Sequence, residues 1–354
     1  MSEPICIDGR LGEGGGQILR TSLALAALLR QPVKLEHIRA NRTNPGLKTQ
    51  HLAGVLALAK ITDAVVQGAH LHSTSLVFMP RTIKGGSYRF EISTAGAATM
   101  LLGAVLPPLL YASQFSEITI TGGTHVPFSP PFQYVEKVFL PALQKLGGTV
   151  DVELTRWGFY PRGGGEIRLQ VKPGHDLLGI RLTKRGRLKE LQLSGCSTDN
   201  LPAHIVQREI AHLETSLADY KDKLRSETSV CRSFSPGNFV FLKAVYENTA
   251  AGFSALGKRG KPAEEVAAET CRAFKGFDRT EATVDSHLAD QLILYLALAH
   301  GDSFIRTEKV TSHLQTNIDV IRKFLPVNID LDSVSGKISL QGVGFNGASQ
   351  HADL

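Results

Sequence analysis

Apolar residues recur along the chain at spacings that predict one order of elements three times. In the first stretch, a short strand at 4–8 precedes a helix at 17–29, a strand at 33–38, a second helix near 47–61, and strands at 75–80 and 86–92. Apolar positions with helical period indicate amphipathic helices, and short apolar or alternating runs between turn residues indicate strands. This stretch therefore predicts two helices packed on one face of a sheet.

The same order follows twice more. The second stretch predicts helices at 94–112 and 132–146 with strands at 117–121, 149–154 and 166–171; the third predicts helices at 286–300 and 313–324 with strands at 303–307, 327–332 and 337–341. A recurring order of elements is typical of repeated supersecondary units. We therefore expect an α+β fold built of α/β repeats, at about residues 1–92, 93–184 and 280–345.

Residues 185–279 interrupt this rhythm. They predict a helix at 203–224, strands at 238–247 and 251–256, and a helix at 262–274 that begins at a proline. The apolar content suffices for a small domain, so we expect an inserted domain at 185–279 and a large domain formed by 1–184 and 280–354. The basic turn at 258–261 could contact phosphate, although a solvated hairpin end is the commoner use of such a turn.

Composition narrows the class of protein. The 354 residues carry a net charge of +6, a mild excess of Lys and Arg that favours anionic partners such as nucleotides or nucleic acid. The four cysteines are scattered without a C-x-x-C pair, which indicates a reduced chain without a zinc site. No apolar run reaches membrane-spanning length and the N-terminus has no signal-peptide pattern, so we expect a cytoplasmic protein with no membrane partner.

A glycine-rich turn lies between the first strand and the first helix. Its sequence, GEGGGQILR at 12–20, lets backbone N–H groups approach an anion at a helix N-terminus, and Glu13 and Arg20 add one charge of each sign. It is neither a P-loop nor a dinucleotide fingerprint. A tight turn with nothing bound fits the spacing equally well.

The loops that join a strand to the second helix of each stretch are expected on one side of the molecule, where a shared site would form. The first loop supplies Arg39, Arg42 and Gln50, and paired arginines are bidentate donors to phosphate oxygens. The second contains Pro130 among aromatic and proline residues that could wall a base, although prolines more often build turns. Each of these loops is also compatible with a surface that binds nothing.

His313 and Asp290 are the candidates in the third stretch. Thr311 or Ser312 is expected to cap the helix, which places His313 in its first turn, where the positive helix end should lower the pKa of the imidazole and keep it neutral. A neutral imidazole is a competent nucleophile toward phosphorus. A histidine at a helix start is more often a surface residue. Asp290 is an acid within an apolar run, so it either pairs with another group or lies at the edge of a site.

Taken together, these motifs resemble the RNA 3′-terminal phosphate cyclases over nearly the whole chain. The motifs that carry the resemblance are DG at 8–9 with GEGGGQILR at 12–20, IRANR at 38–42 with PGL at 45–47, GGT at 122–124 with PP at 130–131, GFYP at 158–161 with GGG at 163–165, LADQL at 288–292, and His313 with TN at 316–317.

The resemblance implies three repeats of a two-helix, four-stranded-sheet unit with an inserted small α/β domain. It also implies an enzyme of the ligase class that uses ATP as a substrate to convert the 3′-phosphate end of an RNA into a 2′,3′-cyclic phosphate. A histidine takes AMP from ATP and releases pyrophosphate; AMP then passes to the RNA 3′-phosphate, giving RNA(3′)pp(5′)A; finally the neighbouring 2′-OH displaces AMP. The RNA end is thus the expected partner.

By position, the resemblance makes His313 the adenylated nucleophile and Glu13 a ligand of Mg²⁺ or Mn²⁺. It assigns the phosphates of ATP or of the RNA end, and the nucleotide itself, to Arg20, Arg39, Arg42, Gln50, Pro130, His287, Asp290 and Gln291. The chain departs from the family at two places: His287 stands where relatives can place a tyrosine against the adenine, and Gly103 stands where they can place a glutamine.

Two other functions compete with the cyclase. The first is a non-catalytic RNA-binding scaffold for ribosome assembly, which the family includes; it lacks the catalytic histidine, and the chain retains His313. The second is an enolpyruvyl-type transferase, which shares the repeat architecture but needs six repeats where this chain has three.

Overall fold

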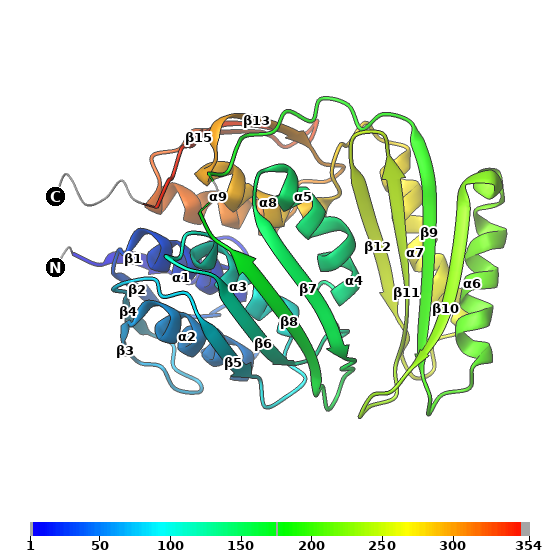
Figure 1. Cartoon of the computed structure of the whole chain (residues 1–354), viewed down its shortest axis with the longest axis horizontal. Helices are drawn as coiled ribbons and strands as arrows, with labels where there is room; N and C mark the ends of the chain where they lie inside the picture. The colour runs from blue at the N-terminus through cyan, green and yellow to red at the C-terminus, as the bar shows by residue number, and fades with distance from the viewer. Residues whose placement is uncertain (1–2, 175, 348–354) are drawn as a thin grey trace.

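The computed structural model describes residues 3–174 and 176–347, and within them the chain forms helices and four small sheets (Figure 1). The mixed α and β composition expected from the sequence is confirmed. Residues 1–2, 175 and 348–354, which the predicted large domain includes, lie outside the described residues. Among the described residues, no helix is long and apolar enough to cross a membrane.

Two of the sheets share one strand order and one set of directions. The first runs β1 (Ile5–Asp8), β2 (Val33–Glu36), β4 (Leu76–Met79) and β3 (Val65–Gln67); the second runs β5 (Ser87–Glu91), β6 (Ser116–Gly122), β8 (Gly165–Lys172) and β7 (Thr149–Arg156). In each, the first two strands are parallel and the other neighbours are antiparallel. The short strand β3 was not predicted, and the assignment of the strand at 86–92 to the first stretch is wrong, because β5 pairs with β6 in the second sheet.

Helices accompany each sheet at nearly the predicted places. They are α1 (Gly16–Leu29) and α2 (Thr49–Thr62) with the first sheet, and α3 (Ala98–Leu110) with a segmented helix α4 (Phe132–Tyr134), η1 (Val135–Phe139) and α5 (Leu140–Lys145) with the second. The segment η1 is a π-helix, so the predicted helix at 132–146 is continuous but changes its hydrogen-bond spacing in the middle.

The third sheet runs β13 (His300–Arg306), β15 (Lys337–Val343) and β14 (Ile329–Asp332), with α8 (Ser286–Leu298) and α9 (Ser312–Phe324). Residues 177–182 lie parallel to β13: the Gly179 N–H donates to the His300 carbonyl at 2.8 Å, and the Leu182 N–H donates to the Phe304 carbonyl at 2.7 Å. This segment, which the sequence analysis grouped with the second stretch, therefore pairs with the third sheet.

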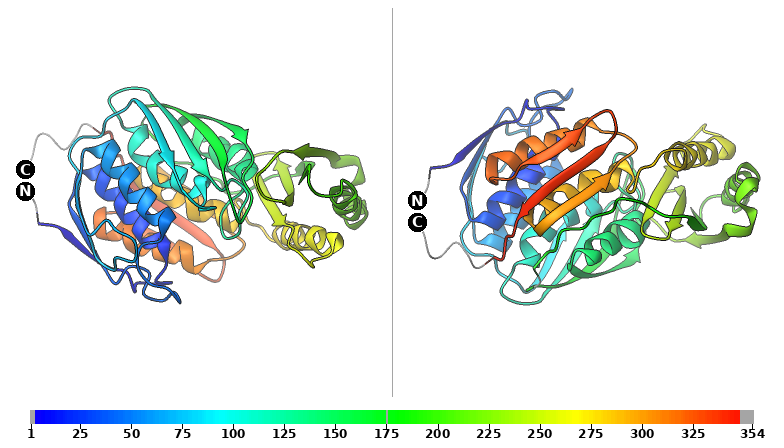
Figure 2. Two further views of the ribbon diagram at one scale, coloured as in Figure 1. Left: turned by 90° about the horizontal axis from the view of Figure 1, so that it is seen from below. Right: turned by 90° about the horizontal axis from the view of Figure 1, so that it is seen from above.

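The helices of the three sheets lie together in the interior, with the sheets outside them (Figure 2). Helix α1 is central: it contacts α2, α3 and α9, and its residues from Ile18 to Leu29 are buried except for Arg20. An apolar helix that contacts three others buries its whole circumference, which explains why α1 has no polar face. The N-terminal ends of α1 and α9 are thereby brought side by side.

The fourth sheet belongs to the stretch 185–279 and has a separate core. Its order is β10 (Leu224–Cys231), β9 (Leu188–Thr198), β11 (Asn238–Tyr246) and β12 (Ala250–Leu256), covered by α6 (His204–Ser216) and α7 (Ala263–Asp278). The predicted helix at 203–224 is wrong beyond Ser216, because Leu217 leaves helical geometry and a 3₁₀ helix, η2 (Ala218–Lys223), follows. The sequence analysis also missed β9 and β10.

Candidate active site

The glycine-rich turn packs against the start of α9, so residues from the two ends of the chain meet. Gly12 has a φ of +54°, in the left-handed region that favours glycine, and a Cβ there would lie 2.1 Å from Thr316 Oγ1. A Cβ on Gly15 would lie 2.4 Å from Glu13 Oε1 and 2.7 Å from Arg42 Nη2. The glycines therefore make room for a neighbouring helix and for the turn's own acidic side chain.

Glu13 lies between a histidine and an arginine. Its Oε1 is 3.3 Å from His313 Nδ1, and its Oε2 accepts a hydrogen bond from Arg42 Nη2 at 3.0 Å. The Glu13 side chain is only 11% exposed, whereas that of His313 is 47% exposed. Because Nδ1 faces the carboxylate, the imidazole presents Nε2 for chemistry.

These contacts determine the charge of the site. The hydrogen bond that His313 Nδ1–H donates to the Glu13 carboxylate raises the pKa of His313, against the opposing effect of partial burial. Burial would raise the pKa of Glu13, but His313, Arg42 and Arg20 together lower it. The expectation that the helix end lowers the pKa of His313 is therefore wrong: a carboxylate in direct contact outweighs a partial charge at the helix terminus. Thr311 does cap α9, since its hydroxyl accepts from the Leu314 N–H at 3.1 Å.

Asn317 ties the helices around the site together, and sequence reasoning gave it no role. Its Oδ1 accepts from Thr21 Oγ1 at 2.6 Å and Gln17 Nε2 at 2.9 Å on α1, and its Nδ2 donates to Asp290 Oδ1 at 2.5 Å on α8. The signal was present: Thr316 and Asn317 follow His313 by three and four residues, which places them on the same helix face. The Thr316 hydroxyl accepts from the Glu13 N–H at 3.3 Å.

Arg20 and Asp290 lie in the same cluster, as the sequence predicted for a shared site. Burial lowers the pKa of the Arg20 guanidinium, and the negative charges of Asp290 and Glu13 oppose that effect. Burial raises the pKa of Asp290, and the charges of His313 and Arg20 counteract it. Two acidic and two basic side chains, from the glycine-rich turn, α1, α8 and α9, thus lie together, and Arg20 also donates to Gln17.

Arg39 and Gln50 lie beside this cluster, and both side chains also make hydrogen bonds to backbone groups that stabilise the fold. Arg39 Nη1 donates to the carbonyls of Asn44 and Gly46, at 2.8 and 2.9 Å, which holds the loop at 39–46 in shape. Gln50 Oε1 accepts from the Ala97 N–H at 3.3 Å, where α3 begins. A guanidinium has five N–H donors, so Arg39 retains donors for an anion.

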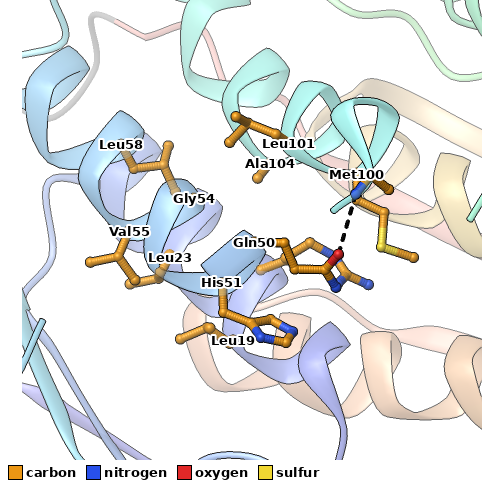
Figure 3. A pocket seen from close by; sticks show the side chains of 12 residues that line it. Leu19, Leu23, Gln50, His51, Gly54, Val55, Leu58, Met100, Leu101 and Ala104 are labelled. Atoms are coloured by element: carbon orange, nitrogen blue, oxygen red, sulfur yellow. Dashed lines mark hydrogen bonds between the residues drawn. The ribbon is translucent and has the colours of Figure 1, made fainter. Parts of the chain in front are cut away.

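A narrow crevice between α1, α2 and α3 begins beside Arg20, with Gln50 and His51 at one end and Leu58 at the other (Figure 3). Its cavity volume of about 20 Å³ is roughly enough for one water molecule. Burial, with Arg20 nearby, lowers the pKa of His51 to about 3, so this imidazole is neutral. His51 therefore adds no positive charge to the cluster.

The residues predicted to hold the adenine lie on the side of α8 and α4. The Pro130 carbonyl accepts from Thr99 Oγ1 at 2.8 Å, just before α4. His287 is exposed in the first turn of α8, and its ring meets that of Tyr134 edge-on with centroids 6.3 Å apart. Gln291 is partly buried one residue after Asp290. Gly103 is exposed in α3, and a Cβ there would meet no atom within 4 Å.

Asp285 joins these elements to the fourth sheet, and sequence reasoning missed it. Its carboxylate caps α8 by accepting from the N–H groups of His287 and Leu288, and it also accepts from Tyr134 Oη at 2.6 Å and the Gly252 N–H at 3.1 Å. The side chain is 1% exposed. An aspartate immediately before an apolar helical run is a recognisable capping signal.

The structure offers limited support for a resident metal. Within the described residues, no group of three or more His, Cys, Asp or Glu side chains is arranged to hold one. Mg²⁺ is commonly bound by one or two carboxylates together with substrate phosphates. Glu13, with both oxygens turned into the cluster, fits that mode as a single ligand.

The arrangement therefore brings together a histidine with a free Nε2, a carboxylate that faces its Nδ1, and arginines suited to phosphate oxygens.

A model of the family described as RNA 3′-terminal phosphate cyclase matches residues 11–331. The chain is 45% identical over 327 residues to the RNA 3′-terminal phosphate cyclase of Trichormus variabilis, covering 90% of this chain and 94% of that protein. It is 41% identical over 350 residues to the protein of the same name from Pyrobaculum aerophilum, covering 96% and 99%. Among solved structures, the enolpyruvyl transferase NikO from Streptomyces tendae aligns at a TM-score of 0.39 and 11% identity over 97% of this chain and 49% of that one, a likeness too low to carry an argument.

Proposed function

The chain belongs to the RNA 3′-terminal phosphate cyclase family and is an enzyme of that class, and we propose that it converts an RNA 3′-phosphate into a 2′,3′-cyclic phosphate at the expense of ATP through an adenylated His313. The observation that carries this proposal is the contact of His313 Nδ1 with Glu13, because it leaves Nε2 as the nucleophilic nitrogen.

In the first step, Nε2 of neutral His313 attacks the α-phosphorus of ATP. The new N–P bond forms as the bond to the bridging oxygen breaks, and pyrophosphate leaves. The imidazole becomes cationic because Nδ1 keeps its proton, and the Glu13 carboxylate at 3.3 Å stabilises that charge as it develops. Glu13 therefore has a positioning and charge-stabilising role that does not depend on a metal.

In the second step, an oxygen of the RNA 3′-phosphate displaces the histidine and takes the AMP. A phosphate dianion must be neutralised before it approaches a second phosphate, and Arg42, Arg20 and the free donors of Arg39 are suited to that task. In the last step the vicinal 2′-OH attacks the activated phosphorus and AMP leaves. The hydroxyl is already held next to the phosphorus, so ring closure is favoured by proximity.

A divalent ion held by Glu13 and the ATP phosphates would withdraw charge from the phosphoryl oxygens when bound. Pro130 and His287 are the side chains we assign to the adenine, with Asp290, Gln291 and Gln50 around the nucleotide. His287 is exposed at the start of α8, so its ring is available to stack on a base.

We also propose that residues 1–184 and 280–354 form one large domain of three repeats, with 185–279 inserted. The shared order and directions of the first two sheets support this. The parallel pairing of residues 177–182 with β13 supplies the strand that the third sheet otherwise lacks. The separate core of the fourth sheet supports the insertion.

The test is incubation with ATP labelled at the α-phosphate and Mg²⁺ or Mn²⁺, followed by a denaturing gel. We expect an acid-labile, alkali-stable protein–AMP adduct in the wild type and none in His313→Ala. His204→Ala is the matched control, since His204 is an exposed histidine at the start of α6 and outside the proposed site. An unlabelled wild type would contradict the mechanism and favour a non-catalytic RNA-binding scaffold, whereas equal labelling of His313→Ala would show that another residue takes the AMP.

A further inference from the structure

Three loops at one end of the second and fourth sheets present aromatic rings to solvent. Phe128 is 98% exposed, Tyr160 66% and Phe234 58%. Single exposed apolar side chains are ordinary, but a group of exposed rings on neighbouring loops indicates a binding surface. Arginines on the same loops complete what we call the aromatic–arginine surface, which consists of Phe128, Arg156, Tyr160, Arg162, Arg232 and Phe234.

Contacts between the loops make this surface continuous. The N–H groups of Thr124 and His125 both donate to the Gly158 carbonyl, at 2.9 and 3.0 Å, which fixes the loop at 123–131 beside the hairpin at 157–164. The Arg162 N–H donates to Ser235 Oγ at 3.0 Å, which fixes that hairpin against the turn at 232–237. The hairpin between β7 and β8 and the turn between β10 and β11 both lie at the lower edge of the molecule in Figure 1.

The arginines of the surface are positioned for anions. The Arg156 guanidinium lies 5.8 Å from the ring centroid of Phe234, and its Nε donates to the Gly164 carbonyl, so its orientation is fixed. The Arg232 side chain is 96% exposed and approaches Asp199 only at 3.8 Å. Such a loose, exposed ion pair leaves most of the guanidinium donors available to a phosphate.

Phe128 belongs to the loop at 123–131, which is the part of this surface that also carries a residue of the candidate active site. It has a φ of +63°, a left-handed conformation that is uncommon for a bulky residue, and its ring projects into solvent instead of packing. It lies two residues before Pro130, which the proposed function assigns to the adenine. An RNA chain that leaves the site past this loop would therefore meet Phe128 first, and then the hairpin at 157–164 and the turn at 232–237.

We propose that the aromatic–arginine surface binds the single-stranded nucleotides that precede the 3′-phosphate of the RNA, an inference that rests on the proposed function. Exposed rings interleaved with arginines are what unpaired RNA requires, because bases stack on the rings and phosphates pair with the guanidinium groups. The surface gives affinity without base-specific hydrogen bonding. It joins the large domain to the inserted stretch, so both hold the RNA.

The test compares a dinucleotide and a dodecanucleotide, each ending in a 3′-phosphate and labelled with a fluorophore at the 5′ end. We expect Phe128→Ala with Tyr160→Ala and Phe234→Ala to weaken binding of the longer RNA by roughly five- to 150-fold per ring that stacks. Binding of the dinucleotide should change less. Replacing the three arginines by Gln should lower the slope of log affinity against log salt by about two.

Phe115→Ala is the control, since Phe115 is 45% exposed at the opposite end of β6. Protein adenylation with ATP alone tests folding and the ATP site, and we expect it to be unchanged in all surface variants. Cyclisation of the longer RNA should show a raised KM with kcat unchanged.

Four results would overturn the proposal. Unchanged affinity for the longer RNA in the ring variant would show that the surface serves another partner, such as a protein. Equal losses for both RNAs would mean that it does not extend beyond the terminal nucleotides. A raised KM for ATP in Phe128→Ala would place that ring at the adenine. An unchanged salt slope in the arginine variant would exclude the phosphate contacts. Failure of the wild type to form the AMP adduct or cyclise any RNA is a separate result, which refutes the proposed function.

Discussion

Replacing Glu13 by Gln is the sharpest test of how His313 works. The substitution keeps the shape of the side chain and its ability to accept from Nδ1–H, but it removes the negative charge that faces the imidazole at 3.3 Å. A hydrogen bond to a charged group contributes about 1.5–3 kcal/mol, which corresponds to roughly 10- to 150-fold in rate if it is made only as the imidazole becomes cationic. Since the His313 side chain is 47% exposed and water screens its charge, we expect a value near the low end, about tenfold.

The pH dependence gives a second, independent readout of the same variant. His313 is nucleophilic only when it is neutral, so adenylation is lost as the pH falls through its pKa. Glu13 raises that pKa, which moves the acid limb of the wild-type profile above the ordinary value of 6.5. Glu13→Gln should therefore move the acid limb to lower pH while it reduces the plateau.

The assay is single-turnover formation of the protein–AMP adduct at saturating ATP across a pH series. Asp8→Asn is the matched control, because Asp8 Oδ1 lies 3.2 Å from His37 Nδ1 in a similar carboxylate–histidine contact that is exposed and outside the site. A Glu13→Gln profile with the wild-type acid limb would refute the reasoning. If Glu13→Gln has the acid limb of the wild type and its maximal adenylation rate recovers at high Mg²⁺, Glu13 acts only as a ligand of the metal.

Three further predictions concern the surroundings of this pair. Arg42→Ala should slow transfer of AMP to a 3′-phosphate RNA more than adenylation of the protein, measured as separate single-turnover steps; equal losses would assign Arg42 to ATP. Gly15→Ala should fold normally but reduce adenylation about tenfold or more, because its methyl group would lie 2.4 Å from Glu13 Oε1; wild-type labelling would show that the turn yields easily. Asp285→Ala should lower the free energy of unfolding, measured in urea, by about 2–4 kcal/mol, since it removes the cap of α8 and the acceptor of the Tyr134 hydroxyl. Asp285→Asn should lower the free energy of unfolding by less.

Local patterns in the sequence predicted the elements of the large part of the chain well. The helix that carries His313 was expected at 313–324 and is found at Ser312–Phe324, with Thr311 as its cap. The helical period of the apolar residues and the capping residue are enough to predict such a helix, because both are properties of residues close together in the sequence. The helix predicted at 203–224 is too long because the helical spacing of apolar residues continues past Ser216. The backbone leaves the helix at Leu217, and the Tyr220 hydroxyl then donates to Asp278.

The site depended on contacts that no local pattern contains. The candidates Glu13, Arg20, Arg42, Asp290 and His313 do lie together, but the direction of the His313 pKa was wrong because its partner is Glu13, about three hundred residues earlier. Asn317 was quoted as part of a motif without a role, since its partners on α1 and α8 are equally remote. Contacts between residues far apart in the sequence thus determine the pKa direction of His313 and the role of Asn317, which local patterns do not predict.

The hydrogen bonds that α9 makes with α1 and with the glycine-rich turn also determine when the site can form during synthesis of the chain. Thr21 and Asn317 are separated by 296 positions, and Glu13 and Thr316 by 303. Because a chain emerges from the ribosome N-terminus first, the glycine-rich turn is synthesised long before α9, which appears only after the strands of the first, second and fourth sheets. Under the proposed mechanism the nascent chain is therefore inactive, and a product that ends before α9 contains Arg20, Arg39 and Arg42 but lacks the nucleophile His313.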